Sequence, residues 1–167
     1  MAKTPIIIGI DPGYDRLGWA VGGQEAGSWN ILAHGCIQTD KKNSLERRYQ
    51  HILTELKAVV KKYQPDEAAI ETLFWSRNKS TAMAVSESRG LILAVFIQAG
   101  LKIAQYTPLQ IKQAVTGYGR ADKKAVEKMV RLELGISQSE AKKIIDDTFD
   151  ALALIVCHHS ARKLNNL

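Results

Sequence analysis

Four carboxylates in this sequence lie beside or inside apolar segments, where ionised side chains are uncommon. Asp11 directly follows the apolar run 5–10, and Glu71 lies within the apolar segment 67–73. Asp147 and Asp150 stand three residues apart at the start of another apolar segment, a spacing that places them on one face of a helix. An ionised carboxylate in such surroundings indicates a paired charge or a bound metal ion.

These carboxylates are suited to metal-dependent hydrolysis of a phosphodiester. Gathered together they would repel one another, and a bound Mg²⁺ ion removes that repulsion because it prefers hard oxygen ligands. Two such ions about 3.5–4 Å apart can activate a water molecule on one side of a phosphate and stabilise the leaving oxygen on the other. The residue types and their positions therefore indicate a metal-dependent nuclease.

Three of these carboxylates also have a simpler interpretation. Asp11 begins an Asp-Pro-Gly segment that can be only a turn, and Glu71 can be a paired acid in the core. Asp147 can be a helix N-cap, favoured there by the helix dipole. Asp146 lies four residues before Asp150 and so shares a helix face with it as well. The spacing alone leaves the choice between Asp146 and Asp147 open.

The periodicity of apolar residues predicts the elements that carry these side chains. Three strands are predicted first, as an antiparallel meander, at residues 5–10, 17–22 and 29–38. Helices and strands then alternate as helix 44–63, strand 67–73, helix 80–99 and strand 101–107. Three more helices are predicted at 108–117, 122–134 and 147–162. Strands separated by helices pair in parallel, so we predict an α/β fold of the ribonuclease-H-like kind, a central mixed five-stranded sheet flanked by helices.

Two helices carry more specific expectations. Asn43 with Glu46 resembles a capping box at the start of the helix 44–63. The helix 80–99 is expected either to pack in the core or to supply a dimer face, through the apolar residues Met83, Val85, Ile92 and Phe96.

The composition is that of a globular protein of one domain. The 167 residues are 46% hydrophobic and 24% charged. There is no apolar run of about 18 residues, and the N-terminus lacks the features of a signal peptide, so we expect a cytoplasmic protein that is not in the membrane. The net charge of +6 suits a polyanionic partner. Cys36 and Cys157 are expected to be buried free thiols.

Basic and aromatic side chains near the acids favour nucleic acid as that partner. Cations flank the segment 117–119 and follow the strand 67–73; they are Lys112, Arg120, Lys123, Lys124, Arg77 and Lys79. Cations bind phosphates, and glycines let the backbone approach them closely. Phe74 and Trp75 can stack on an unpaired base or anchor their loop in the core. A second basic group is expected to be plain surface charge: Lys41, Lys42, Arg47, Arg48, Lys61 and Lys62.

In four stretches the sequence resembles the RuvC family of bacterial Holliday-junction resolvases. They are Gly9–Gly13 with Gly18–Val21, Ala69–Phe74 with Arg89 and Gly90, Ile111–Val115 with Gly117–Gly119 and Lys123, and Asp147–Ala153 with His158. Together they extend from about Ile6 to Ser160, in the order and spacing of that family.

The resemblance implies a structure-selective DNA endonuclease. Carried over by motif, the family's four catalytic and metal-binding acids are Asp11, Glu71, Asp147 and Asp150, which selects Asp147 over Asp146. The implied cofactor is Mg²⁺, two ions per site, or Mn²⁺. The implied function is to resolve Holliday junctions by paired nicks in two like-polarity strands, during DNA recombination and repair.

The resemblance also implies partners and DNA contacts. We expect a single RuvC-like nuclease domain over residues 1–167 that works as a homodimer on four-way junction DNA, beside a branch-migration complex of the RuvA and RuvB type. The expected DNA contacts are Phe74, as a wedge at the junction centre, with Arg77, Lys112, Arg120 and Lys123. His158 is expected to be structural. The sequence departs from the family at Leu17, where threonine is common, and at Trp75, where methionine is frequent.

Two other functions share some of these features. One half of an actin-like or sugar-kinase ATPase also begins with a strand, an aspartate and glycines, but such proteins need a second domain that 167 residues do not provide. A binding module without catalysis is disfavoured as well, because four acids without metal ions would repel DNA.

Overall fold

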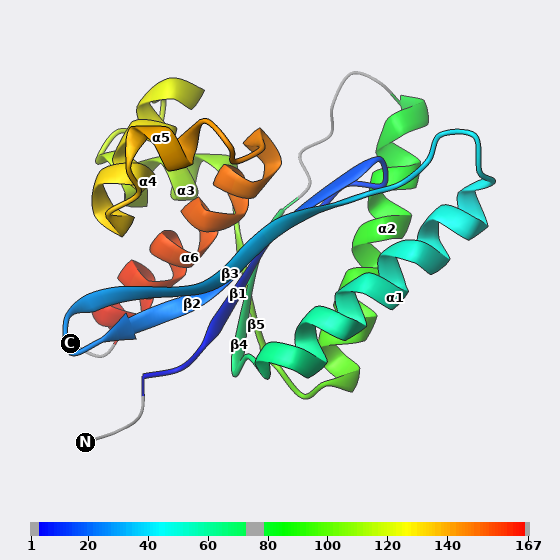
Figure 1. The fold of residues 1–167 in the computed structure, drawn as a ribbon, viewed down its shortest axis with the longest axis horizontal. Coiled ribbons are helices and arrows are strands. Elements are labelled where there is room, and N and C mark those ends of the chain that lie inside the picture. The colour runs from blue at the N-terminus through cyan, green and yellow to red at the C-terminus, as the bar shows by residue number, and fades with distance from the viewer. Residues whose placement is uncertain (1–3, 73–78, 166–167) are drawn as a thin grey trace.

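The computed structural model describes residues 4–72 and 79–165, and its centre is a mixed five-stranded sheet (Figure 1). The strands are β1 (Ile7–Asp11), β2 (Arg16–Glu25), β3 (Ser28–Gln38), β4 (Glu67–Glu71) and β5 (Lys102–Tyr106). They lie in the order β3-β2-β1-β4-β5. β1, β2 and β3 form an antiparallel meander, while β4 pairs in parallel with both β1 and β5. The predicted sheet and its antiparallel edge are confirmed.

The parallel pairs place chemically important strand ends side by side. Ile10 is in register with Ile70, so the residues that follow them, Asp11 and Glu71, end adjacent strands at the same edge of the sheet. The buried positions that precede each acid hold the strands in the core. Glu71 is in turn in register with Tyr106, the last residue of β5.

Two helical layers cover the sheet, one on each face (Figure 1). The helices are α1 (Leu45–Tyr63), α2 (Lys79–Gln98), α3 (Pro108–Thr116), α4 (Lys123–Leu134), α5 (Gln138–Ala141) and α6 (Asp146–Asn165). One hydrophobic cluster joins the sheet to α1 and α2, through side chains such as Ile52, Leu56 and Phe96. The other joins the opposite face to α3, α4 and α6, through side chains such as Val130 and Leu152. The sheet therefore separates two cores.

The helices differ from the sequence prediction at several points. The N-cap of α1 is Ser44, whose side chain accepts a hydrogen bond from the backbone of Arg47, so the capping box expected at Asn43 is wrong. The short helix α5 was not predicted, although Ser137 and Glu140 form a capping box there. The last helix begins one residue earlier and ends later than predicted, at Asp146 and Asn165. By contrast, α3 and α4 end at Gly117 and Gly135, as predicted, and the structure shows both glycines in the left-handed region.

The remaining expectations about the fold concern exposure. Ile92 and Phe96 of α2 are fully buried, so this part of the helix packs in the core, whereas Met83 and Ile97 are exposed. Cys157 is a buried free thiol, but Cys36 is only half-buried. Among the described residues, no helix has the length and apolar character needed to cross a membrane.

Candidate active site

The four predicted acids come from three elements that meet at one edge of the sheet. Asp11 and Glu71 end the adjacent parallel strands β1 and β4. Asp147 and Asp150 lie in the first two turns of α6, which packs on β1, β2 and β4. The electrostatic influence of Asp150, Glu71 and Asp147 reaches Asp11, so all four share one environment.

Two glycines allow α6 to lie against the sheet at the distance that this arrangement needs. A Cβ atom added to Gly18 would lie 1.8 Å from the backbone oxygen of Asp147, and one added to Gly9 would lie 2.2 Å from the backbone oxygen of Ala151. Neither position has room for a side chain, because a backbone atom cannot move aside without moving its helix. The Thr148 hydroxyl adds a hydrogen bond of 3.0 Å to the carbonyl oxygen of Gly35 on β3. The first turn of α6 is thus fixed to β2 and β3.

The site carries more negative charge than its partly buried position favours. Burial, together with the charges of Asp150, Glu71 and Asp147, raises the pKa of Asp11 to about 8. Burial and the charge of Asp150 raise the pKa of Glu71 to about 7, although Lys112 and Lys123 oppose this rise. Burial also raises the pKa of Asp150. In the absence of further positive charge, Asp11 therefore retains its proton at neutral pH.

Two basic side chains partly neutralise the acids of α6. The Lys123 ammonium donates a hydrogen bond of 3.0 Å to Asp150, and this interaction raises the pKa of Lys123 although burial would lower it. The Nε atom of Arg16 lies 3.0 Å from Oδ2 of Asp147. Arg16 was not predicted from the sequence. A signal for it existed, since a strand that returns in antiparallel pairing after Asp11 must bring its first residues back to the same edge of the sheet.

The structure distinguishes Asp147 from Asp146. The side chain of Asp146 is 71% exposed and lies 3.7 Å from Lys123, whereas that of Asp147 is 19% exposed. Asp147 raises the pKa of Asp11, and Asp146 is not among the groups that do so. This difference supports the assignment that the family resemblance made and that the residue spacing left open.

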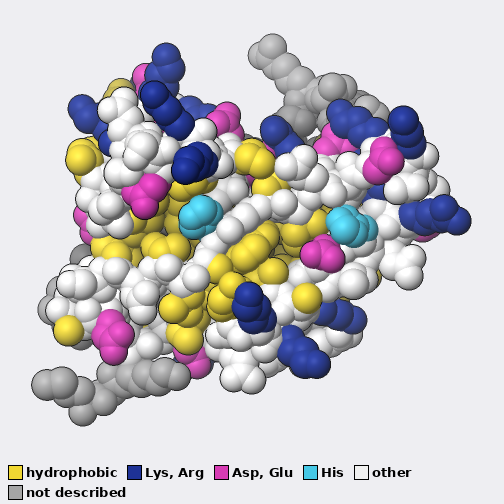
Figure 2. All heavy atoms as spheres, in the orientation of Figure 1, with side chains coloured by type: hydrophobic (Ala, Val, Ile, Leu, Met, Phe, Trp, Pro, Cys, Tyr) yellow, Lys and Arg dark blue, Asp and Glu magenta, His cyan; other side chains and the backbone are white. Residues whose placement is uncertain are grey.

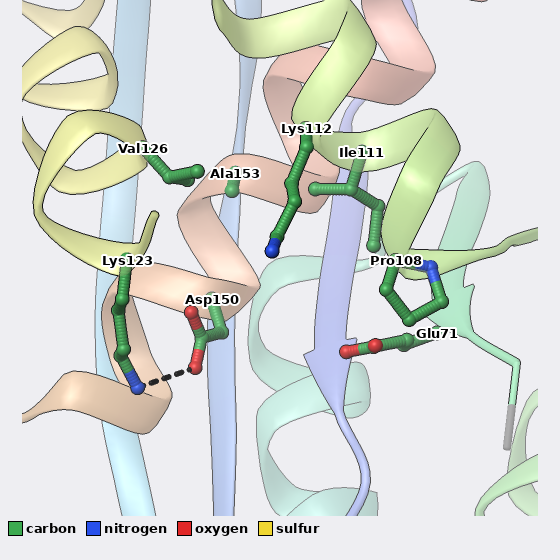
Figure 3. Close-up of a pocket in the computed structure, with 8 residues that line it drawn as sticks. All are labelled: Glu71, Pro108, Ile111, Lys112, Lys123, Val126, Asp150 and Ala153. Carbon is green, nitrogen blue, oxygen red and sulfur yellow. Dashed lines mark hydrogen bonds and ion pairs between the residues drawn. The ribbon is translucent and has the colours of Figure 1, made fainter. Parts of the chain in front are cut away.

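A cavity of about 230 Å³ lies between two of the acids and two of the predicted basic residues. Glu71 and Asp150 enter it from opposite sides, Lys112 reaches in from α3, and Lys123 lies beside Asp150 (Figure 3). The remaining walls are apolar and come from Pro108, Ile111, Val126 and Ala153. Such a cavity, lined by both carboxylates and ammonium groups, can accommodate a phosphate together with cations that bridge it to the acids.

The donor set fits a hard divalent cation. Oδ2 of Asp147 is buried and has no hydrogen-bond partner, although Arg16 is close enough for an ion pair. The ion pair with Arg16 therefore leaves the hydrogen-bonding capacity of this oxygen unused, and a metal ion could use it. In residues 4–72 and 79–165, however, no group of three His, Cys, Asp or Glu side chains is already arranged to hold a metal ion. One oxygen of Asp150 faces Lys123 and one of Asp147 faces Arg16, so these cations compete with a metal ion for the two carboxylates.

Only one of the other predicted DNA contacts lies within the described residues. Arg120 is exposed on the turn between α3 and α4. Phe74, Trp75 and Arg77 lie outside the described residues, and so does the side chain of Lys79. Lys and Arg side chains show both over α4 and along α1 in Figure 2, so surface charge by itself does not single out a DNA-binding face.

One member of the supposed surface group is in fact buried. Arg48 is 8% exposed, and its guanidinium binds Asp15, the Thr39 hydroxyl and the carbonyl oxygen of Tyr14. The expectation of plain surface charge was therefore wrong for Arg48. It fixes the loop that follows Asp11 to the start of α1.

His158 belongs to a buried polar network below the site. Its Nδ1 atom lies 2.6 Å from the Tyr106 hydroxyl, and its Nε2 atom lies 2.8 Å from Glu67, which also binds Arg162 at 2.9 Å. Burial lowers the pKa of His158, so its ring is neutral at pH 7. The network joins β4, β5 and α6 and supports the structural role expected for His158.

Comparison with known proteins gives one consistent result. The family model "Crossover junction endodeoxyribonuclease RuvC" matches residues 7–158. The RuvC protein of Caldicellulosiruptor saccharolyticus is 43% identical over 91% of this chain and 90% of its own length. That of Petrotoga mobilis is 40% identical over 95% of each chain.

Solved structures agree with these relatives. Thermus thermophilus RuvC in complex with Holliday junction substrate superimposes with a TM-score of 0.88, at 28% identity over 96% of both chains. The yeast mitochondrial resolvase Ydc2 shares the fold, with a TM-score of 0.69 at 12% identity over 96% of this chain and 80% of its own. With the family model matched along most of its length, this chain belongs to the RuvC family of crossover junction endodeoxyribonucleases.

Proposed function

We propose that this RuvC-family chain resolves Holliday junctions, by metal-dependent hydrolysis of phosphodiester bonds in two strands of like polarity. The Thermus thermophilus relative is bound to a Holliday junction substrate and shares this fold over nearly the whole chain. The observation that carries the proposal is the set of four partly buried acids at one sheet edge, with the pKa of Asp11 raised to about 8. Such a set is costly to keep unless a cation binds it.

The four acids come from different elements of the fold and share one proposed role, metal binding. We assign metal binding to Asp11 and Glu71 from the strands and to Asp147 and Asp150 from α6. Two Mg²⁺ ions, or Mn²⁺, supply when bound the positive charge that activates a water molecule and stabilises the leaving oxygen. The strands and the close-packed helix fix the backbone positions of the four acids before the DNA arrives, which reduces the cost of ordering them during the reaction.

The basic residues act on the DNA side of the site. Lys112 and Lys123 line the same cavity as Glu71 and Asp150, which supports their assignment as phosphate contacts at the cleaved bond. Lys123 donates a hydrogen bond of 3.0 Å to one oxygen of Asp150, so it competes with a metal ion for this carboxylate. We assign Arg120 to a neighbouring phosphate, and Phe74 and Arg77 to the junction centre.

The assembly that we propose is a homodimer of single-domain chains, each comprising residues 1–167. A two-fold dimer matches a junction that presents two equivalent strands. Met83 and Ile97, exposed on α2 at 69% and 68%, support an apolar contact between copies. We place the protein in the cytoplasm, beside a branch-migration complex of the RuvA and RuvB type.

Cleavage of a synthetic four-way junction tests the function directly. With Mg²⁺ the purified protein should cut the junction and largely spare a linear duplex of the same sequence, and EDTA should stop the reaction. Asp11→Asn should abolish cleavage and retain junction binding, because the substitution removes a ligand and a negative charge together.

The matched control is Glu55→Gln, which alters an exposed acid of α1 on the other side of the sheet and should cut at the wild-type rate. Equal cutting of junction and duplex would contradict the resolvase function and leave a nuclease. Cleavage by Asp11→Asn at the wild-type rate would contradict the assignment of Asp11 to the active site.

A further inference from the structure

Two consecutive residues of α2 hold the two strand ends that carry acids. The Ser88 hydroxyl donates a hydrogen bond of 3.0 Å to the carbonyl oxygen of Gly13, two residues after Asp11. The neighbouring Arg89 donates from Nε, at 3.3 Å, to the carbonyl oxygen of Glu71 itself. Neither side chain contacts a carboxylate group, but Arg89 binds the backbone of Glu71 and Ser88 binds the backbone of the loop that directly follows Asp11.

Both contacts have features of a fixed anchor. Ser88 is fully buried, so its hydroxyl cannot exchange this bond for one with water. Arg89 makes a second bond of 2.5 Å, from Nη2 to the side-chain oxygen of Gln105 on β5. Its planar guanidinium therefore joins the end of β4 to the neighbouring strand in one rigid geometry.

The geometry of a helix makes the pair more effective than either contact alone. Consecutive residues point about 100° apart around a helix axis, so two such bonds resist both rotation and sliding of α2. A third link holds the same helix from outside, because the Tyr49 hydroxyl of α1 bonds Glu87 at 2.6 Å and the carbonyl oxygen of Ala84 at 3.1 Å. The position of α2 is therefore defined relative to both strand ends.

We propose that Ser88 and Arg89 are positioning residues, through which α2 sets the relative position of Asp11 and Glu71 and hence the affinity of the site for divalent metal. This inference rests on the proposed function, because it concerns the same metal site. Asp147 and Asp150 are held from the opposite face of the sheet by the contact of α6 with Gly9 and Gly18. Two independent layers thus converge on one set of ligands, and a displacement of α2 shifts only the ligands that the strands carry.

Direct measurement of Mn²⁺ binding tests this role without relying on catalysis. Free Mn²⁺ is counted by electron paramagnetic resonance as it is titrated into Ser88→Ala and Arg89→Lys. Each variant should bind Mn²⁺ about tenfold more weakly than the wild type, the scale at which residues that orient metal ligands act. The loss of the buried Ser88 bond should lower the thermal midpoint of the metal-free protein while leaving it folded at the temperature of the titration. The affinity of both variants for a junction in EDTA should stay close to the wild-type value, and cleavage should recover at high Mn²⁺ concentration.

The controls keep the experiment decisive. Ser86→Ala changes an exposed serine of the same helix and Arg47→Lys an exposed arginine of α1, and both should bind Mn²⁺ like the wild type. If Arg89→Lys or Ser88→Ala folds poorly, Gln105→Leu removes the outer bond of Arg89 at an exposed position and should weaken Mn²⁺ binding in the same direction.

Two failures are distinguishable. If Asp11→Asn loses Mn²⁺ while Ser88→Ala, Arg89→Lys and Gln105→Leu bind it like the wild type, the positioning role is refuted and the metal site stands. If Asp11→Asn also binds Mn²⁺ and cuts like the wild type, the proposed function itself is refuted.

Discussion

Removing the charge of Asp11 should stabilise the metal-free protein, and the gain should grow with pH. The pKa of this carboxyl is raised from 3.8 to about 8, mainly by burial and then by the charges of Asp150, Glu71 and Asp147. Between these two pH values the folded state holds a proton that the unfolded state has released. The stability of the wild type therefore falls as pH rises through this window, and the loss is complete above about pH 8.

The expected size follows from the same shift. One pKa unit corresponds to about 1.4 kcal/mol, so three pH units between pH 5 and pH 8 correspond to an upper limit of about 4 kcal/mol. Asn has nearly the shape of the protonated acid and cannot ionise, so Asp11→Asn lacks this loss. A difference of this size is a large part of the roughly 5–15 kcal/mol that stabilises a typical domain.

Urea unfolding in EDTA, at pH 5, 6, 7 and 8, measures the difference between Asp11→Asn and the wild type. The variant should gain steadily with pH, and saturating Mg²⁺ should reverse the order by stabilising the wild type alone. A difference that is the same at pH 5 and pH 8, or a wild type that is the more stable protein at pH 8 without metal, would refute the electrostatic account of the site.

Three further predictions concern single residues in the site and in the polar network below it. Asp147→Asn should abolish junction cleavage and Asp146→Asn should retain it, because only the first removes a half-buried ligand; the opposite result in a cleavage assay would show that the register is wrong. Lys123→Ala should shift the acidic limb of the pH–rate profile to higher pH, because Asp150 then loses the cation that lowers its pKa; an unmoved limb would contradict this coupling. Glu67→Gln should lower the free energy of unfolding by about 2 kcal/mol, since a buried acceptor of charge-assisted hydrogen bonds loses its charge. Urea unfolding at pH 7 measures this difference, and an unchanged free energy of unfolding would contradict the importance of that network.

Much of the fold was predictable because it depends on local patterns. The repeat of apolar residues along α1 and the short β-branched run of β1 each determine one element without reference to the rest of the chain. Pro108 and Gly135 mark helix ends for reasons of backbone geometry alone. The helix α5, at Gln138–Ala141, is too short to show a periodic pattern, so the capping box of Ser137 and Glu140 was the only sequence signal for it.

The site was less predictable wherever its geometry depends on distant contacts. Asp11 and Glu71 could be paired from the sequence, since adjacent parallel strands end at one edge. The position of Arg16 at this edge was available from the antiparallel return of β2 but was missed. The contact of Lys123 with Asp150 was not available, because it forms only after α4 and α6 have packed. Arg48 shows an available signal that was missed, because it lies four residues before Ile52 on the buried face of α1.

The lack of space at Gly9 and Gly18 affects which positions a mutational screen of this protein would identify as essential. Selection for cells that survive DNA damage would report these two glycines as no less essential than the carboxylates, although neither offers an atom to DNA or metal. Any larger residue at Gly18 meets the backbone of Asp147 and pushes the start of α6 off the sheet. Intolerance to substitution at these two glycines therefore reflects the close packing of α6 on the sheet and not a role in catalysis. The number of essential positions would exceed the number of residues that take part in cleavage.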